Sequence, residues 1–97
     1  MLTRLHIRTK DGTTHAFMYH QLDSNAEFKG GEFKLLFAGA KHWEIRVKGN
    51  GPRLWEVFDY LCLHRWPFLV EATRDFGGDG DTVFASIEIV DVTPKVA

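Results

Sequence analysis

The stretch that decides the fold, residues 49–67, reads GNGPRLWEVFDYLCLHRWP. It is the only part of the chain whose apolar residues recur at helical spacing, and they form one stripe: Leu54, Val57, Phe58, Leu61 and Cys62. Gly51 and Pro52 predict the start, and Pro67 predicts the end, because proline suits a first helical turn and disfavours helix at the preceding residue. We expect an amphipathic helix between Pro52 and Arg65, packed on a sheet because three turns of helix are marginal alone.

The segment before this helix begins with a predicted hairpin. Residues 2–9 and 13–21 alternate in polarity as strands do. Asp11 and Gly12 between them favour a two-residue type I′ turn. That register places four apolar side chains on the core side: Leu5, Ile7, Ala16 and Met18.

A second hairpin is predicted to turn at Gly30 and Gly31. A two-residue turn there sets complementary residues opposite each other: Lys29 with Glu32, Glu27 with Lys34, and Phe28 with Phe33. The next turn, around residues 39–41, must contain an odd number of residues, because only then do the apolar side chains of both strands share one face. The resulting apolar pairs are Phe33 with Val47, Leu35 with Ile45, and Phe37 with Trp43.

Two more strands are expected after the helix, over residues 68–73 and 82–92, with a loop rich in glycine and aspartate between them. Residues 93–97 are expected to fray. The predicted fold class is α+β: a mainly antiparallel sheet of six to seven strands, in the order β-β-β-β-β-α-β-β, with one amphipathic helix packed on it. Residues 1–97 are expected to form a single domain.

Composition favours an ordinary soluble domain. The chain is 44% hydrophobic and 13% aromatic, and its net charge is −1, which argues against strong electrostatic capture of a polyanion. Cys62, the single cysteine, is expected to be a buried core residue in a reducing, cytoplasmic setting. No signal peptide is recognisable, and no segment approaches the ~20 apolar residues of a membrane span.

No motif assigns catalysis, because no nucleophile, base and orienting group can be named together. We therefore expect a non-enzymatic protein without a cofactor. The five histidines offer at most His6 and His15 on one face, short of the three or four ligands of a zinc site.

Two loops could hold an ion, and a turn explains each of them better. A calcium site at Asp75, Asp79 and Asp81 competes with an ordinary polar loop. An anion site at residues 49–51, with Arg53 beside it, competes with a simple strand-to-helix turn.

The outward side of the first hairpin is the predicted binding surface. It combines basic and aromatic side chains: Arg4, His6, Arg8, His15, Phe17 and Tyr19. Aromatic residues with arginine are typical of partner surfaces, so we expect a protein-interaction module that binds a partner or a second copy of itself through this side and any unpaired sheet edge. The alternative is a nucleic-acid or small-anion binder, in which Phe17 and Tyr19 stack on bases while Arg4 and Arg8 contact phosphates. Two further interpretations compete with these. The last strand or the tail covers this side and makes it a second small core, or Phe17 and Tyr19 are scattered apolar residues of an ordinary surface.

The order of the expected elements resembles that of small bacterial single-domain proteins of unknown function. It consists of two hairpins, a strand ending in Val47-Lys48-Gly49, and a helix that begins at about Leu54 and closes with His64-Arg65. The resemblance covers roughly residues 2–72 and matches no characterised family. It implies a bacterial, cytoplasmic origin and brings no activity, cofactor or partner with it.

Overall fold

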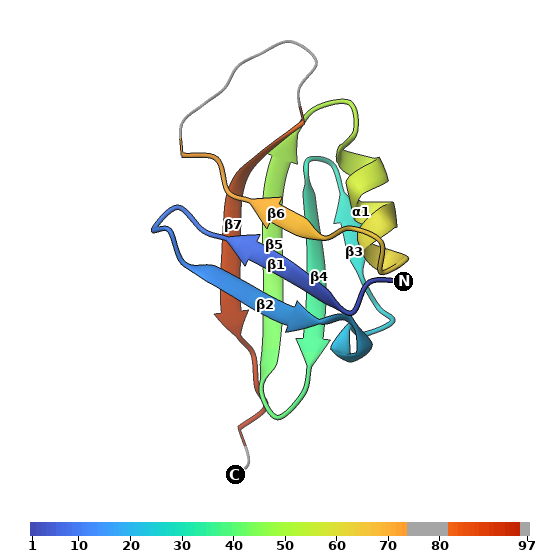
Figure 1. The fold of residues 1–97 in the computed structure, drawn as a ribbon, viewed down its shortest axis with the longest axis vertical. Helices are drawn as coiled ribbons and strands as arrows, with labels where there is room; N and C mark the ends of the chain where they lie inside the picture. The colour runs from blue at the N-terminus through green and yellow to red at the C-terminus, as the bar shows by residue number, and fades with distance from the viewer. Residues whose placement is uncertain (74–81, 96–97) are drawn as a thin grey trace.

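The computed structural model describes residues 1–73 and 82–95, and within them seven strands and one α-helix form an α+β fold (Figure 1). The strands are β1 (Arg4–Arg8), β2 (Thr14–Met18), β3 (Glu27–Lys29), β4 (Glu32–Ala38), β5 (His42–Asn50), β6 (Phe68–Val70) and β7 (Val83–Asp91). A short 3-10 turn, η1 (Tyr19–Gln21), follows β2, and α1 (Leu54–Cys62) precedes β6. The expected fold class, strand count and element order are confirmed.

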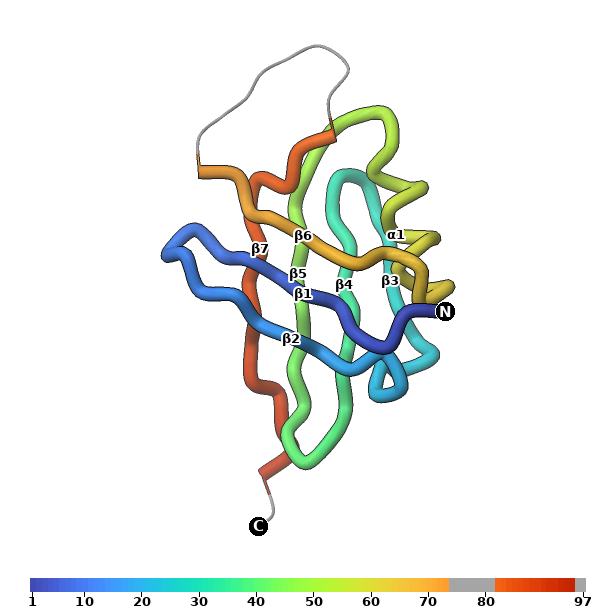
Figure 2. The backbone as a smooth tube through the Cα atoms, viewed as in Figure 1, coloured from blue at the N-terminus to red at the C-terminus, as the bar shows by residue number. Residues whose placement is uncertain are grey.

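The strands form two sheets instead of one, in the orders β2-β1-β6 and β3-β4-β5-β7. Figure 2 shows the strands of the smaller sheet crossing those of the larger, with α1 at one side next to β3. The core lies between the inner faces of the sheets and the apolar stripe of the helix. Its fully buried members include Leu5, Ile7, Leu69, Phe33, Leu35, Ile45 and Leu61.

The two predicted hairpin registers of the larger sheet are confirmed. Phe28 lies opposite Phe33, with the two opposite-charge pairs on either side. Across the next turn, Leu35 lies opposite Ile45 and Phe37 opposite Trp43. Apolar alternation on both strands determines these registers, because a slip of one residue would turn the aromatic residues toward solvent.

The predicted register of the first hairpin is wrong by one residue. Leu5 pairs with Phe17 and Ile7 pairs with His15. The loop has three residues, with a type I turn closed by the Gly12 N–H donating to the Thr9 carbonyl at 3.0 Å, and Gly12 itself at φ +87°. Asp-Gly suits this loop as well as the two-residue turn, and the difference exchanges the two faces of β2.

The helix is shorter than predicted at both ends. α1 begins at Leu54, because its N-cap, Arg53, has φ −107° and ψ 10°, outside the helical region, and Gly51 before it has φ +123°. At the other end His64 takes the left-handed conformation, with φ +58°. The N–H of Arg65 then donates to the Tyr60 carbonyl at 2.9 Å, which is the Schellman arrangement that ends a helix.

The helix stripe is also narrower than predicted. Leu54, Val57 and Leu61 are buried, and Phe58 packs its ring 5.3 Å from that of Phe28. Cys62, expected in the core, is exposed. It is the last helical residue, directly before the C-cap Leu63.

A buried carboxylate connects the two sheets. The side chain of Glu71, just after β6, accepts a hydrogen bond from the backbone N–H of Lys10 at 2.7 Å and another from that of Ile87 in β7 at 2.8 Å. The N–H of Ala72 also donates to the Phe84 carbonyl at 2.9 Å. The end of β6 is thereby attached to β7 of the larger sheet.

Nine residues make up α1, the one α-helix among residues 1–73 and 82–95, so no described helix is long enough to cross a lipid bilayer.

Candidate functional site

The six residues of the predicted binding surface divide between two sides of the smaller sheet. Arg4, His6 and Arg8 lie on its outer side, as predicted. His15, Phe17 and Tyr19 belong to the opposite side, because the one-residue shift in register turns them inward. The surface as predicted therefore does not exist as one face.

Phe17 and Tyr19 are core residues, 8% and 1% exposed. The ring of Phe17 lies 5.1 Å from that of Phe37. Tyr19 stacks on His64 at 4.9 Å and donates its hydroxyl hydrogen bond to the Trp66 carbonyl. Burial raises the pKa of Tyr19 well above its ordinary value. Neither ring is available to stack on a base.

The observed outer face contains eight residues, identified from the pairings of β1 with both of its neighbours: Arg4, His6, Arg8, Thr14, Ala16, Met18, Phe68 and Val70. Phe68 is 39% exposed and Val70 is 48% exposed. In Figure 1 no described helix or strand lies over this face. The sequence did not predict that Phe68 and Val70 belong to this face, because no sequence pattern indicates that β6 pairs with β1 in parallel.

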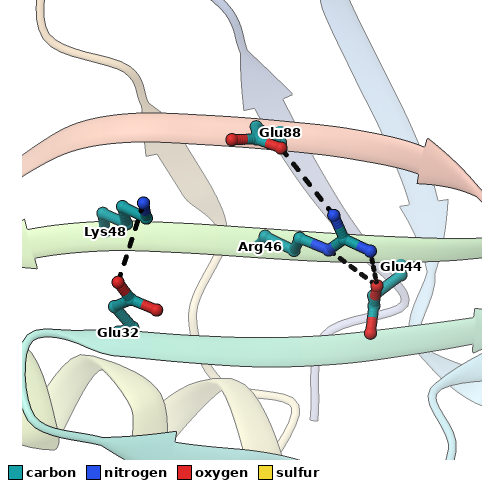
Figure 3. A network of polar contacts seen from close by, with 5 residues as sticks. All are labelled: Glu32, Glu44, Arg46, Lys48 and Glu88. Atoms are coloured by element: carbon teal, nitrogen blue, oxygen red, sulfur yellow. Dashed lines mark hydrogen bonds and ion pairs between the residues drawn. The ribbon is translucent and has the colours of Figure 1, made fainter.

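Charge on the outer face has one sign. Arg4 and Arg8 are exposed, no carboxylate belongs to this face, and neither arginine has an ion-pair partner among residues 1–73 and 82–95. The outer side of the larger sheet is different (Figure 3). There Arg46 contacts Glu44 at 2.7 Å, and Lys48 lies 3.7 Å from Glu32. Opposite charges neutralise each other on the larger sheet and do not on the smaller one.

The free edge of β2 is the second feature of the site. In antiparallel pairs, hydrogen-bonded and non-bonded residue pairs alternate. The N–H of Thr9 donates to the Thr13 carbonyl and the N–H of Tyr19 donates to the Thr3 carbonyl, both at 3.0 Å. The hydrogen-bonded positions of this strand are therefore every second residue between Thr13 and Tyr19. The residues between them have backbone N–H and C=O groups that point away from β1: Thr14, Ala16 and Met18. Within the described ranges, no strand pairs with this edge.

A cleft of about 480 Å³ opens beside that edge, between the two sheets. The first hairpin contributes Thr9, Asp11, His15, Ala16 and Phe17 to its walls, and the larger sheet contributes Trp43 and Ile89. In Figure 1 the lower parts of β4, β5 and β7 continue past β2, so the larger sheet projects beyond the smaller one here. The exposed strip of its inner face forms the floor of the cleft.

Asp11 marks the rim of the cleft. Its carboxylate accepts hydrogen bonds from the Thr9 hydroxyl at 2.6 Å and from the Thr13 N–H at 2.9 Å. These hydrogen bonds hold the pKa of Asp11 below its ordinary value. This side chain therefore links both ends of the hairpin loop.

The remaining predicted sites are accounted for as follows. Among residues 1–73 and 82–95, no three potential metal ligands lie together. Residues 74–81, which include Asp75, Asp79 and Asp81, lie outside the described residues. At the start of the helix, the Arg53 N–H donates to the Thr82 hydroxyl at 3.1 Å and its guanidinium contacts Glu56 at 3.0 Å, so these groups already have partners.

Comparison of the chain with protein-family models, with curated proteins and with solved structures found no match in any of the three.

Proposed function

We propose that this domain is a non-catalytic protein-interaction module that binds an extended segment of a partner protein along the free edge of β2. The observation that carries the proposal is the outward direction of the backbone groups of Thr14, Ala16 and Met18 beside an open cleft. An added strand gains main-chain hydrogen bonds from such an edge and specificity from the pockets next to it.

Addition of a partner strand also explains why the edge of β2 has none of the features that normally prevent strand pairing. Proteins usually cover, charge or shorten an edge strand, because unpaired backbone groups attract other chains. β2 carries no Lys, Glu, Asp or Pro. The single cysteine with an exposed thiol agrees with a reducing, cytoplasmic setting, which forms part of the proposal.

Replacing Ala16 with proline tests the proposal. Ala16 makes no hydrogen bond to β1, so Ala16→Pro removes one outward N–H while leaving the pairing of the hairpin intact. Peptides selected on the wild-type domain from a random displayed library should lose binding to Ala16→Pro and keep it for the matched control Ala16→Ser. Their binding should also slow hydrogen exchange at the amides of Thr14, Ala16 and Met18. Equal binding to both variants would refute the proposal.

A second candidate function is the binding of single-stranded nucleic acid on the outer face. The exposed ring of Phe68 stacks on His6 at 6.1 Å, and Arg4 and Arg8 lie on the same face. Rings beside cations suit base stacking and phosphate contact. Fluorescence anisotropy with labelled oligonucleotides should then show affinity that falls steeply with salt. The net charge of −1 places this candidate second.

A further inference from the structure

The site beside β2 also constrains the sequence of its ligand, an inference that rests on the proposed function. Side chains of a strand point alternately to its two sides. In a strand added to β2, every second side chain would lie on the outer face, level with Thr14, Ala16 and Met18. The intervening side chains would point toward the floor of the cleft.

The outer positions of such a ligand would meet positive charge. Neighbouring strands lie about 4.8 Å apart, so an added strand is about 10 Å from β1, a gap that an arginine and a glutamate side chain can close together. Arg4, His6 and Arg8 recur at every second residue, the same repeat as the outer positions of the ligand. With no carboxylate on the outer face, acidic ligand side chains are favoured there and basic ones are repelled.

The inner positions would meet the apolar part of the cleft lining. Phe17, Trp43 and Ile89 line the cleft, whose volume of about 480 Å³ is enough for a large side chain. Against these three residues a charged side chain would lose its hydration without gaining a partner, whereas an aliphatic or aromatic one would bury its surface. The polar part of the lining is supplied by Thr9, Asp11 and His15.

A second copy of the chain fits this site poorly. Pairing β2 with β2 would offer only Thr14, Ala16 and Met18 to the outer face, so no carboxylate would reach the arginines. The larger sheet of each copy also projects past its own β2 (Figure 1), and the two projections would compete for the same space. A single extended strand avoids both conflicts.

We propose that the preferred ligand is an extended peptide in which acidic residues alternate with large apolar ones, its carboxylates facing Arg4 and Arg8 and an apolar side chain seated between Phe17 and Trp43.

The test uses three blocked peptides and calorimetric titration of the full chain. The first has the repeat Glu-Leu-Glu-Phe-Glu-Leu, the second has lysine in place of every glutamate, and the third has the first composition with its glutamates grouped together. The alternating acidic peptide should bind at least about tenfold more tightly than either of the others. Arg4→Glu combined with Arg8→Glu should reverse the preference toward the lysine peptide. Arg46→Glu, on the outer side of the larger sheet, should not change it.

The outcomes separate this inference from the proposed function. If all three peptides bind equally to the wild type and none to Ala16→Pro, the edge binds strands and the inference is wrong. If the acidic peptide binds Ala16→Pro as tightly as the wild type, both are wrong, because binding then needs only charge. A dimer that Ala16→Pro dissociates, or an oligonucleotide that displaces the peptide, would make the occupant a second copy or a nucleic acid and would overturn the inference. The absence of binding to every peptide at millimolar concentration would overturn both.

Discussion

Removal of the Glu71 carboxylate should be among the most destabilising changes in this chain. Glu71 is 9% exposed and accepts two backbone hydrogen bonds, from Lys10 and from Ile87, that connect the smaller sheet to the larger one. Each hydrogen bond to a charged group contributes about 1.5–3 kcal/mol. Ile87 is 4% exposed, so its N–H would stay unsatisfied, whereas Lys10 is exposed and its N–H would regain water. Two such bonds together contribute about 3–6 kcal/mol, and rehydration of the Lys10 N–H favours the lower part of that range, so Glu71→Ala should lower the free energy of unfolding by about 3–4 kcal/mol.

Urea denaturation followed by circular dichroism measures this loss directly. Glu71→Gln keeps one oxygen acceptor and should cost less, about 1.5–3 kcal/mol. It also provides a measurable variant if Glu71→Ala does not fold. The matched control is Glu32→Ala, which removes an exposed carboxylate 3.7 Å from Lys48 and should cost less than about 1 kcal/mol.

Hydrogen exchange supplies a local readout for the same change. The amide of Ile87 should exchange faster in Glu71→Gln than in the wild type, because the amide group of glutamine cannot replace both carboxylate oxygens as acceptors. If Glu71→Ala loses no more stability than Glu32→Ala, and exchange at Ile87 is unchanged, the carboxylate does not join the sheets and the reasoning fails.

Three other predictions concern the helix, its cysteine and the first loop. Leu61→Ala should cost about 2–5 kcal/mol in chemical denaturation, whereas the exposed Trp55→Ala should cost little; equal losses would mean that the buried face is misassigned. Cys62 is exposed, so iodoacetamide should modify its thiol in the native state. Partial desolvation and the nearby charge of Asp59 raise the pKa of this thiol, so the rate of modification should rise at higher pH than for free cysteine. Modification seen only after denaturation would show that the thiol is buried. The folded-state pKa of Asp11 is lowered, so its contribution to stability is present above its unfolded pKa and is lost as pH falls through its folded pKa. Asp11→Asn should therefore weaken the acid dependence of the melting temperature, and an unchanged acid limb would contradict this.

The larger sheet could be predicted in detail because several signals in it agree. In the second hairpin, Phe28 and Phe33 pair across the turn while the opposite charges beside them also match. In the hairpin of β4 and β5, Leu35 lies opposite Ile45 only if the turn contains an odd number of residues. When a wrong register would expose aromatic residues and separate charges at once, local sequence is sufficient to fix it.

The first hairpin lacked such agreement. Residues on both sides of β2 are apolar, with Ala16 and Met18 on one side and Phe17 and Tyr19 on the other, so alternation does not say which side faces the core. Asp11-Gly12 fits a two-residue or a three-residue loop. Three of the six predicted surface residues consequently lie on the inner side of the smaller sheet, two of them in the core, and the volume of the two aromatic rings was the signal that favoured the true register.

Contacts between distant segments could not be predicted at all. A glutamate near the end of a strand, such as Glu71, is usually a surface residue, and its burial depends on backbone groups of Lys10 and Ile87. The position of Phe68 on the outer face likewise depends on parallel pairing with β1. Propensity and periodicity describe only neighbours in sequence.

The parallel pairing of β1 with β6 limits how early this chain can assemble during synthesis. His6 pairs with Phe68, about sixty residues further along, so the central strand of the smaller sheet can gain its second neighbour only after β6 has emerged from the ribosome. At about 5–20 residues per second the wait lasts about 3–12 s. Such distant pairing also gives a high contact order and slow folding. β1 is thus fully paired only several seconds after it is made, and chaperones can engage it in that interval.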